Sequence, residues 1–299
     1  MRKSHLVVQI GSKVVRIGNC GDHEPLLTHF WSPEDAFDES LITRLFRVWL
    51  QNPLMVDCSK TEILVVENLL LPMAKKMLIY RVFTQNLGIA KVTFVPDALM
   101  SLVASGLRNG LIVDVGWEHL MVIPVFDLRI IDHGLQISTK GGSWLADQIS
   151  TVLSTGAEST SEKVIERLLC QAVELTDKDI LLRNVIDQEF VGEKAADNFD
   201  LDDFPIIPLI MRAYDSLAVD VRESLKKQVV FSGLAFWTPA LRTHCELLLP
   251  EFRVVESLGP WTGGSLYFEQ LIRSDSLERF EKSKPAPNDW HLQKFEVYK

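Results

Sequence analysis

The sequence predicts an α/β protein that consists of two similar halves, and two observations lead to this prediction. The pattern of an apolar strand, a glycine turn and a second apolar strand occurs twice, at residues 6–17 and 111–123. Predicted strands also alternate with predicted helices in both halves, which is typical of α/β architecture. The repeat indicates a duplicated β-hairpin unit whose copies face each other across a cleft. Backbone N–H groups gathered at such glycine turns suit phosphate oxygens.

The first half begins with three short predicted strands within residues 5–29, separated by glycine-containing turns. Apolar residues at helical spacing then predict an amphipathic helix over 37–51, which Pro53 ends. The next elements are, in order, a strand at 63–66, a helix at 72–87, a strand at 92–95 and a helix at 96–106.

The second half begins with the other hairpin unit, over residues 110–135, and then becomes mainly helical. Seven acidic residues and one lysine occupy the stretch from Asp187 to Asp203, which predicts an exposed loop, with an acidic docking segment as the alternative. The other expected elements are helices at 143–153, 161–174, 177–187 and 205–225, a strand at 229–231, a helix from 239, a strand-like segment at 252–255 and a helix after 263–264.

Composition restricts the possible partners and compartments. The net charge is −9, whereas nucleic-acid-binding proteins usually carry basic surfaces, so DNA and RNA are not expected as ligands. The adjacent lysine pairs, Lys75-Lys76 and Lys226-Lys227, are interpreted as solvated helix faces. The four cysteines have neither disulfide-framework nor zinc-ligand spacing, so no disulfide and no metal site are expected. No apolar stretch approaches the roughly 18 residues of a membrane span and no signal peptide is recognisable, which predicts a soluble intracellular protein without membrane contact.

Five segments, taken in order, resemble signature segments of the actin family. Residues 9–18 with Gly21-Asp22 are similar to the first phosphate loop of actins, and residues 112–116 through Pro124 are similar to the second. The other three are the run at 98–106, the adenosine-segment match Phe231-Ser232-Gly233 with Pro239, and Trp261-Thr262-Gly263-Gly264-Ser265-Leu266.

The resemblance implies an actin-like fold, which is a duplicated, ribonuclease H-like α/β architecture with two domains around a central cleft. The first domain would comprise residues 1–108 with 260–299, and the second residues 109–259. The positions that match the nucleotide cleft are Gly11, Ser12, Asp114, Gly116 and Gly233.

Several residues depart from the actin pattern at this cleft. Gln9 replaces the aspartate that helps to organise the nucleotide-bound metal, and Asp97 and Met121 replace the glutamine and histidine that assist the attacking water. Trp117 and Glu118 would add bulk and negative charge beside a polyphosphate. We therefore expect no catalytic residues, no metal and no required cofactor, with ATP or ADP binding weak or vestigial. The alternative is that the retained loop residues serve only the turns.

Both outer lobes of the actin pattern are shortened. The interval from Asp22 to Glu67 contains only one helix and one strand, and the 90 residues from Gly142 to Ser232 are mostly helical. In the resembling family the outer lobes form the pointed end of the filament and the base subdomains form the barbed end. A subunit with intact base subdomains and reduced outer lobes can dock on the pointed end of a filament, but it presents little surface to which a following subunit could bind.

Among divergent members of this family the trimmed pattern is most similar to the pointed-end actin-related protein of the dynactin complex. This implies a non-catalytic cytoplasmic and cytoskeletal subunit that caps the dynactin minifilament and supports dynein-driven transport and nuclear and spindle positioning. Its partners would be the actin-related filament subunit and other pointed-end subunits, and it would not polymerise with itself. The alternatives are a nuclear actin-related subunit of a chromatin-remodelling complex and an active ATPase or kinase of the same superfold. Trp290, Phe295 and Tyr298 in the polar tail are the candidate partner anchor.

Overall fold

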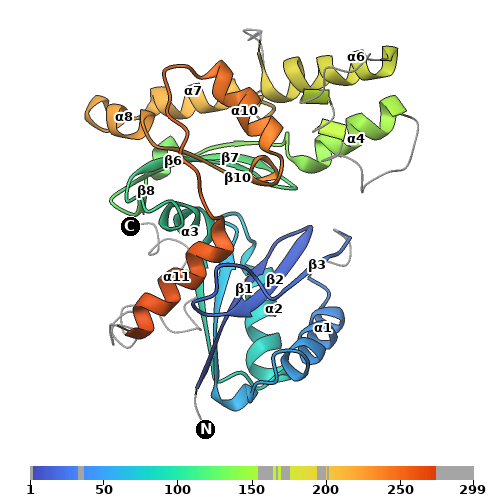
Figure 1. Ribbon diagram of the computed structural model, residues 1–299, viewed down its shortest axis with the longest axis vertical. Helices are drawn as coiled ribbons and strands as arrows, with labels where there is room; N and C mark the ends of the chain where they lie inside the picture. Colours follow the sequence, from blue (N-terminus) through green and yellow to red (C-terminus); the bar gives the residue numbers. More distant parts are fainter. Residues whose placement is uncertain are drawn as a thin grey trace. The chain divides into compact units, whose positions relative to one another are not determined.

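A computed structural model describes residues 3–32, 37–153, 164–165, 168–169, 176–193, 200 and 202–273 of the chain (Figure 1). The chain divides into two compact units, Met1–Gly106 with Leu258–Lys299, and Leu107–Ser257. The boundaries expected from the sequence, 108/109 and 259/260, lie two residues further along the chain. The last described helix therefore belongs to the same unit as the first strand.

The first unit contains a five-stranded sheet with the strand order β3-β2-β1-β4-β5. The strands are β1 (Ser4–Ile10), β2 (Val14–Asn19), β3 (Leu27–Phe30), β4 (Thr61–Glu67) and β5 (Lys91–Pro96). The first three form an antiparallel meander, whereas β4 and β5 run parallel to β1. Every residue of β4 is buried, as expected for a parallel strand that is covered on both faces.

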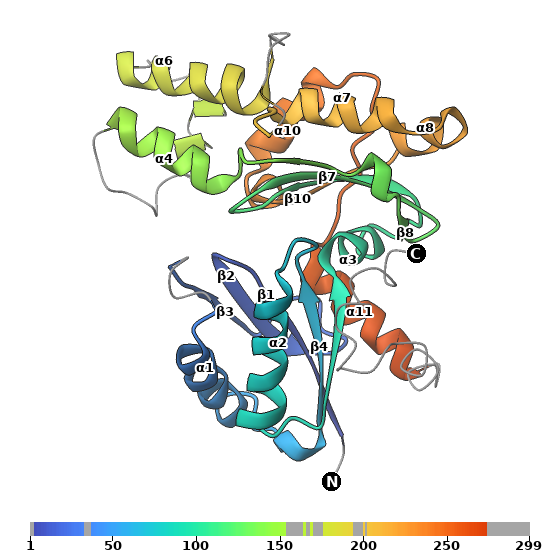
Figure 2. The same cartoon turned by 180° about the vertical axis from the view of Figure 1, so that it is seen from behind.

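Helices cover both faces of this sheet (Figures 1 and 2). They are α1 (Glu39–Gln51), η1 (Cys58–Lys60), α2 (Met73–Arg81) with its π-helical continuation η2 (Val82–Asn86), α3 (Asp97–Val103) and α11 (Pro260–Arg273). Leu6 and Val8 of β1 belong to the apolar cluster that includes α1 and α2. Val7, which points to the opposite face, belongs to the cluster that includes α3 and α11. The alternating apolar side chains of β1 thus create two cores.

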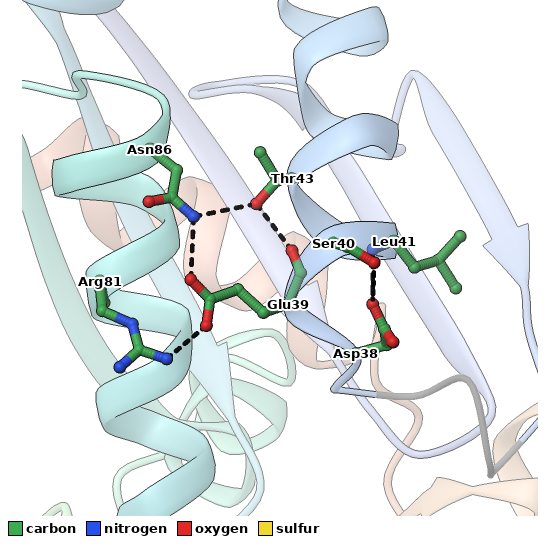
Figure 3. Close-up of polar contacts among 7 residues, drawn as sticks. All are labelled: Asp38, Glu39, Ser40, Leu41, Thr43, Arg81 and Asn86. Carbon is green, nitrogen blue, oxygen red and sulfur yellow. Dashed lines mark hydrogen bonds and ion pairs between the residues drawn. The ribbon is translucent and has the colours of Figure 1, made fainter.

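The start of α1 is fixed both by its own first turn and by the α2–η2 segment (Figure 3). Asp38 caps the helix by accepting a hydrogen bond from the backbone N–H of Leu41 at 2.7 Å. Glu39 pairs with Arg81 and accepts a hydrogen bond from Asn86 Nδ2 at 3.1 Å. These contacts hold the first turn of α1 against the neighbouring helix.

The second unit contains a five-stranded sheet in which β10, β6, β7 and β8 are successive neighbours and β9 pairs with β7. The strands are β6 (Gly110–Val115), β7 (Leu120–Phe126), β8 (Arg129–Ile130), β9 (Gln136–Ser138) and β10 (Val229–Gly233). The antiparallel pairing of β6 with β7 and its parallel pairing with β10 repeat the pairing of β1 with β2 and β4. The duplicated hairpin unit predicted from the sequence is confirmed.

The helices of the second unit lie on one face of its sheet (Figures 1 and 2). They are η3 (Asp132–Gly134), α4 (Gly142–Leu153), α6 (Asp177–Asn184) with its π-helical continuation η5 (Val185–Val191), α7 (Ile206–Ser216), α8 (Val219–Lys226), α9 (Leu234–Trp237) and α10 (Pro239–Leu248). Leu111, Val113 and Val115 of β6 pack into the core beneath them. No helix within the described ranges combines the length and the apolar character needed to cross a membrane.

Two helix boundaries in this unit differ from the sequence prediction. The single helix expected over 205–225 is two helices, α7 and α8, because the backbone is extended at Leu217 and Ala218. Arg222 Nε donates to the Leu217 carbonyl at 2.8 Å, which satisfies a group left open by the break. The loop expected to begin at Asp187 begins later, since the chain remains helical through η5.

Two further predictions concern short or partly described segments. The strand-like segment at 252–255 is reduced to an isolated bridge between Val229 and Val254. Most of the helix predicted over 161–174 lies outside the described residues, as do residues 194–199 of the acidic stretch. The tail beyond residue 273, which carries the predicted partner anchor, also lies outside them.

Candidate functional site

The first hairpin loop, residues 11–13, connects β1 to β2 and is closed by hydrogen bonds within the first unit. The backbone N–H of Gly11 donates to the Val14 carbonyl at 2.9 Å, and Trp31 Nε1 donates to the Gly11 carbonyl at 3.1 Å. Trp31 is buried, and its backbone N–H donates to the Lys13 carbonyl at 3.2 Å. Ser12 lies between these anchored residues. The indole of Trp31 therefore fixes the shape of the loop.

The two loop glycines differ in how strongly the backbone requires them. A Cβ at Gly11 would lie 3.4 Å from the Val14 carbonyl oxygen, which is an ordinary contact, and its φ is not in the left-handed region. A Cβ at Gly116 would lie only 2.8 Å from the His119 carbonyl oxygen, which the hairpin holds in place. The backbone of the turn therefore leaves no room for a side chain at residue 116, whereas it would accept a small side chain at residue 11.

An arginine lies beside the position where the actin pattern has its metal-organising aspartate. Gln9 and Arg16 are directly opposite each other in the β1–β2 pairing. Arg16 Nη1 donates to Gln9 Oε1 at 2.9 Å, and the arginine side chain is buried. A neutral amide in contact with a guanidinium offers no negative charge to a hydrated cation.

A buried ion pair lies at the end of β4, near the carboxyl ends of the parallel strands. Lys76 Nζ lies 2.5 Å from Glu67 Oε1, and the two side chains are only 5% and 9% exposed. The ammonium also lies 4.7 Å from the centre of the Phe94 ring. The sequence interpretation of Lys76 as part of a solvated helix face was therefore wrong, because α2 turns this lysine toward the sheet.

Asp97, at the position of the water-orienting glutamine in actins, begins α3. Its Oδ1 accepts a hydrogen bond from the Ala98 backbone N–H at 2.7 Å, and its Oδ2 accepts one from Asn68 Nδ2 at 3.3 Å. Negative charge in the first turn also favours the helix electrostatically. Both carboxylate oxygens are therefore engaged in the structure of the helix start.

The second hairpin loop, in the second unit, is joined to the start of α4. The backbone N–H groups of Gly142 and Ser143 donate to the carbonyls of Gly116 and Trp117 at 2.8 and 2.9 Å. A Cβ at Gly141 would lie 2.6 Å from the Trp117 carbonyl oxygen, so the glycine permits this approach. Free backbone N–H groups at the start of a helix can bind a phosphate. At the start of α4 two of these groups instead donate to carbonyl oxygens of the hairpin loop.

Asp114 is the penultimate residue of the buried strand β6 and lies beside the adenosine-segment match. Burial raises the pKa of the Asp114 carboxyl to about 6, and a hydrogen bond from Ser232 acts in the opposite direction. Gly233 has φ +66°, and a Cβ there would lie 2.2 Å from the Val115 carbonyl oxygen and 2.9 Å from Asp114 Oδ1. Gly233 is therefore required by the close approach of β10 to β6.

The structure places the predicted cleft residues in two groups, one in each unit. Gly11 and Ser12 lie together in the first loop, and Asp114, Gly116 and Gly233 lie together at the ends of β6 and β10. Of the described tryptophans, Trp31 and Trp261 are buried, whereas Trp237 is 55% exposed. Trp290, Phe295 and Tyr298 lie outside the described residues.

Sequence reasoning missed two buried charged residues in the first unit, Arg16 and Lys76. Arg16 could have been found, because a hairpin turn at 11–13 places residue 16 opposite residue 9. Lys76 carried no such signal, since α2 has no amphipathic pattern that would mark its buried face and its partner Glu67 is supplied by a strand.

The comparisons with known proteins agree with this architecture. Residues 37–188, about half of the chain, match the family model for actin. The chain is also 19% identical over 275 residues to the actin-like protein ARP10 of Saccharomyces cerevisiae, an alignment that covers 91% of this chain and 87% of that protein. Together with two sheets of the same duplicated topology, this match shows that the chain belongs to the actin family.

Proposed function

We propose that this actin-related protein is a non-catalytic structural subunit that caps the pointed end of the dynactin actin-like filament. In this role it acts in the cytoplasm and supports dynein-driven transport and nuclear and spindle positioning. The observation that carries the proposal is the short connection between β3 and α1, which consists of residues 31–38. Conventional actins place an outer lobe between the corresponding elements.

The short connection bears on assembly because a filament needs two complementary surfaces on every subunit. The base of the first unit retains its complete five-stranded sheet with helices on both faces. The surface that would receive the next subunit is formed in actins by the outer lobes, and here eight residues replace the first of them. A subunit of this shape can end a strand of actin-like subunits, but it offers little for continuing one.

The non-catalytic part of the proposal is supported by the residues near the two hairpin loops. Gln9 is bound to Arg16, and the carboxylate of Asp97 is engaged at the start of α3. Met121, at the position of the histidine of actins, is buried, and a thioether cannot accept or deliver a proton at neutral pH. Positioning and proton transfer are the contributions on which phosphoryl transfer to water depends.

The proposal is tested by identifying the proteins that accompany the full-length chain in cells. A tagged copy is purified under mild conditions beside a tagged conventional actin of the same cell, and bound proteins are quantified by mass spectrometry. We expect the chain, but not the actin control, to enrich the actin-related filament subunit of dynactin and its other pointed-end subunits. Enrichment of the ATPase subunit of a chromatin-remodelling complex in place of dynactin would contradict the proposal.

A further inference from the structure

Three side chains with metal-ligating atoms converge in the second unit, away from both hairpin loops. Asp187 lies in η5, Glu193 lies just beyond the end of η5, and His244 lies in α10. One ligand atom of each residue lies within 4.8 Å of the corresponding atoms of the other two. Imidazole and carboxylate groups in one cluster are typical ligands of a zinc-like cation.

Two of the three ligand atoms are shielded from water and have no hydrogen-bond partner. Asp187 Oδ1 and His244 Nε2 are both fully buried and unsatisfied, although they lie only 3.2 Å apart. This distance is within ion-pair range if His244 is protonated, but the two atoms do not meet the geometry of a hydrogen bond. Buried polar atoms without partners are unusual in a folded protein, and a bound cation would satisfy both atoms at once.

The local backbone brings Glu193 back toward Asp187. The Asp187 carbonyl accepts hydrogen bonds from the N–H groups of both Gly192 and Glu193, at 3.0 and 2.8 Å. Gly192 is left-handed, with φ +82°, and a Cβ there would lie 2.8 Å from Pro205 and from Pro208. A glycine is therefore needed for this reversal, and π-helical turns such as η5 occur frequently at functional sites.

We propose that Asp187, Glu193 and His244 bind a divalent transition-metal ion, with Zn²⁺ as the best-fitting ion. Zinc bonds of about 2.0–2.1 Å in a tetrahedral arrangement place neighbouring ligand atoms roughly 3.3 Å apart. The Asp187 Oδ1 to His244 Nε2 distance of 3.2 Å matches this spacing. The Glu193 side chain is exposed, and its ligand atom lies within 4.8 Å of the other two. A water molecule would occupy the fourth position.

The surroundings of Asp187 favour this geometry and this class of ion. Arg183 Nε lies 3.5 Å from Asp187 Oδ2, so the second carboxylate oxygen is held while Oδ1 faces the other ligands. Mg²⁺ and Ca²⁺ prefer oxygen ligands only, and the imidazole of His244 therefore disfavours them. Bound zinc would join the end of η5 to α10. The inference does not depend on the proposed capping function.

The test is zinc binding by the full-length chain after treatment with a chelator. Calorimetric titration with ZnCl₂ is compared for the native protein, Glu193→Gln, His244→Gln and the control His133→Gln, whose side chain is exposed in η3. We expect one ion per chain, at least about tenfold weaker binding in the two ligand variants, and unchanged binding in the control. Glu193→Gln alters an exposed side chain, so it decides the question even if His244→Gln does not fold.

Two further readouts distinguish a built site from surface binding. Co²⁺ substituted for zinc should give the visible absorption of a tetrahedral complex in the native protein and in His133→Gln, but not in Glu193→Gln. ZnCl₂ should raise the melting temperature of the native protein, whereas MgCl₂ at the same concentration should not. Equal zinc affinity in the native protein and Glu193→Gln, or no tetrahedral Co²⁺ signal, would overturn the proposal.

Discussion

Arg16 Nη1 donates a hydrogen bond to Gln9 Oε1 at 2.9 Å across the β1–β2 hairpin, at the position where actins have a metal-organising aspartate. This contact puts a buried guanidinium and a neutral amide where a hydrated Mg²⁺ would need negative charge. Residue 9 therefore lacks the negative charge of the actin pattern, and its amide is bound by a buried cation. The proposed absence of hydrolysis rests on this change of charge rather than on any change in the fold.

We predict that the purified chain does not hydrolyse ATP, and that Gln9→Asp alone does not create the activity. Asp97 and Met121 would still fail to orient and deprotonate the attacking water. Single-turnover phosphate release with Mg-ATP measures this directly, with conventional actin as the positive control. Release by the unaltered chain at the rate of a filament-forming actin would contradict the prediction.

The glycines of the two units should respond very differently to alanine. Gly233→Ala places a Cβ 2.2 Å from a backbone oxygen at a left-handed position, so we expect a loss of about 3 kcal/mol or more in the free energy of unfolding. Gly11→Ala meets only an ordinary contact, and we expect a change of less than about 1 kcal/mol. Urea unfolding of both variants provides the comparison. Similar losses in the two variants would show that the loop geometry described for Gly11 is incorrect.

The ion pair between Glu67 and Lys76 should behave as a coupled unit. Lys76→Met leaves the Glu67 carboxylate buried without its cation, which typically costs about 3–5 kcal/mol. We expect Glu67→Gln combined with Lys76→Met to be less destabilised than the sum of the single variants, by more than about 1 kcal/mol. A double-mutant cycle from urea unfolding gives this coupling. Strict additivity would mean that the two side chains do not interact in solution.

Asp114 should give the protein a characteristic pH dependence. Its folded pKa of about 6 lies above the ordinary value of 3.8, so the folded state favours the protonated carboxyl. The stabilisation is complete below about pH 4 and is lost as the pH rises through 6, by up to about 3 kcal/mol. Asp114→Asn should lack this loss, because the amide does not titrate. The unfolding free energies of the native protein and Asp114→Asn, measured from pH 4 to 8, should therefore change relative to each other as the pH rises through 6. Parallel pH curves for the two proteins would contradict the raised pKa of Asp114.

Much of the fold was accessible from the sequence because its signals are local. The turn glycines with flanking apolar runs predicted both hairpins, and Pro53 correctly marked the end of α1. The break between α7 and α8 was missed, since Leu217 and Ala218 are compatible with a helix and only the tertiary structure extends them. The local sequence pattern therefore predicted the helices and strands better than it predicted a break within a helical segment.

The candidate site was predicted less completely, because its character depends on contacts between distant residues. The loop residues lie in the hairpin turns that their glycines predicted, but the burial of Lys76 depends on Glu67 and Phe94, which belong to two different strands. The convergence of Asp187 with His244, 57 positions apart in the sequence, likewise requires η5 to pack beside α10. Neither arrangement leaves a periodic signal in the sequence.

The capping function requires a specific position of the chain within its native assembly, and this position can be observed. Electron microscopy of the complex purified through the tagged full-length chain, with the tag marked by an antibody fragment, would locate it on the filament. We expect a single label at one end of the filament, with actin-like neighbours on one side only. Labels along the strand with actin-like subunits on both sides would contradict the capping function.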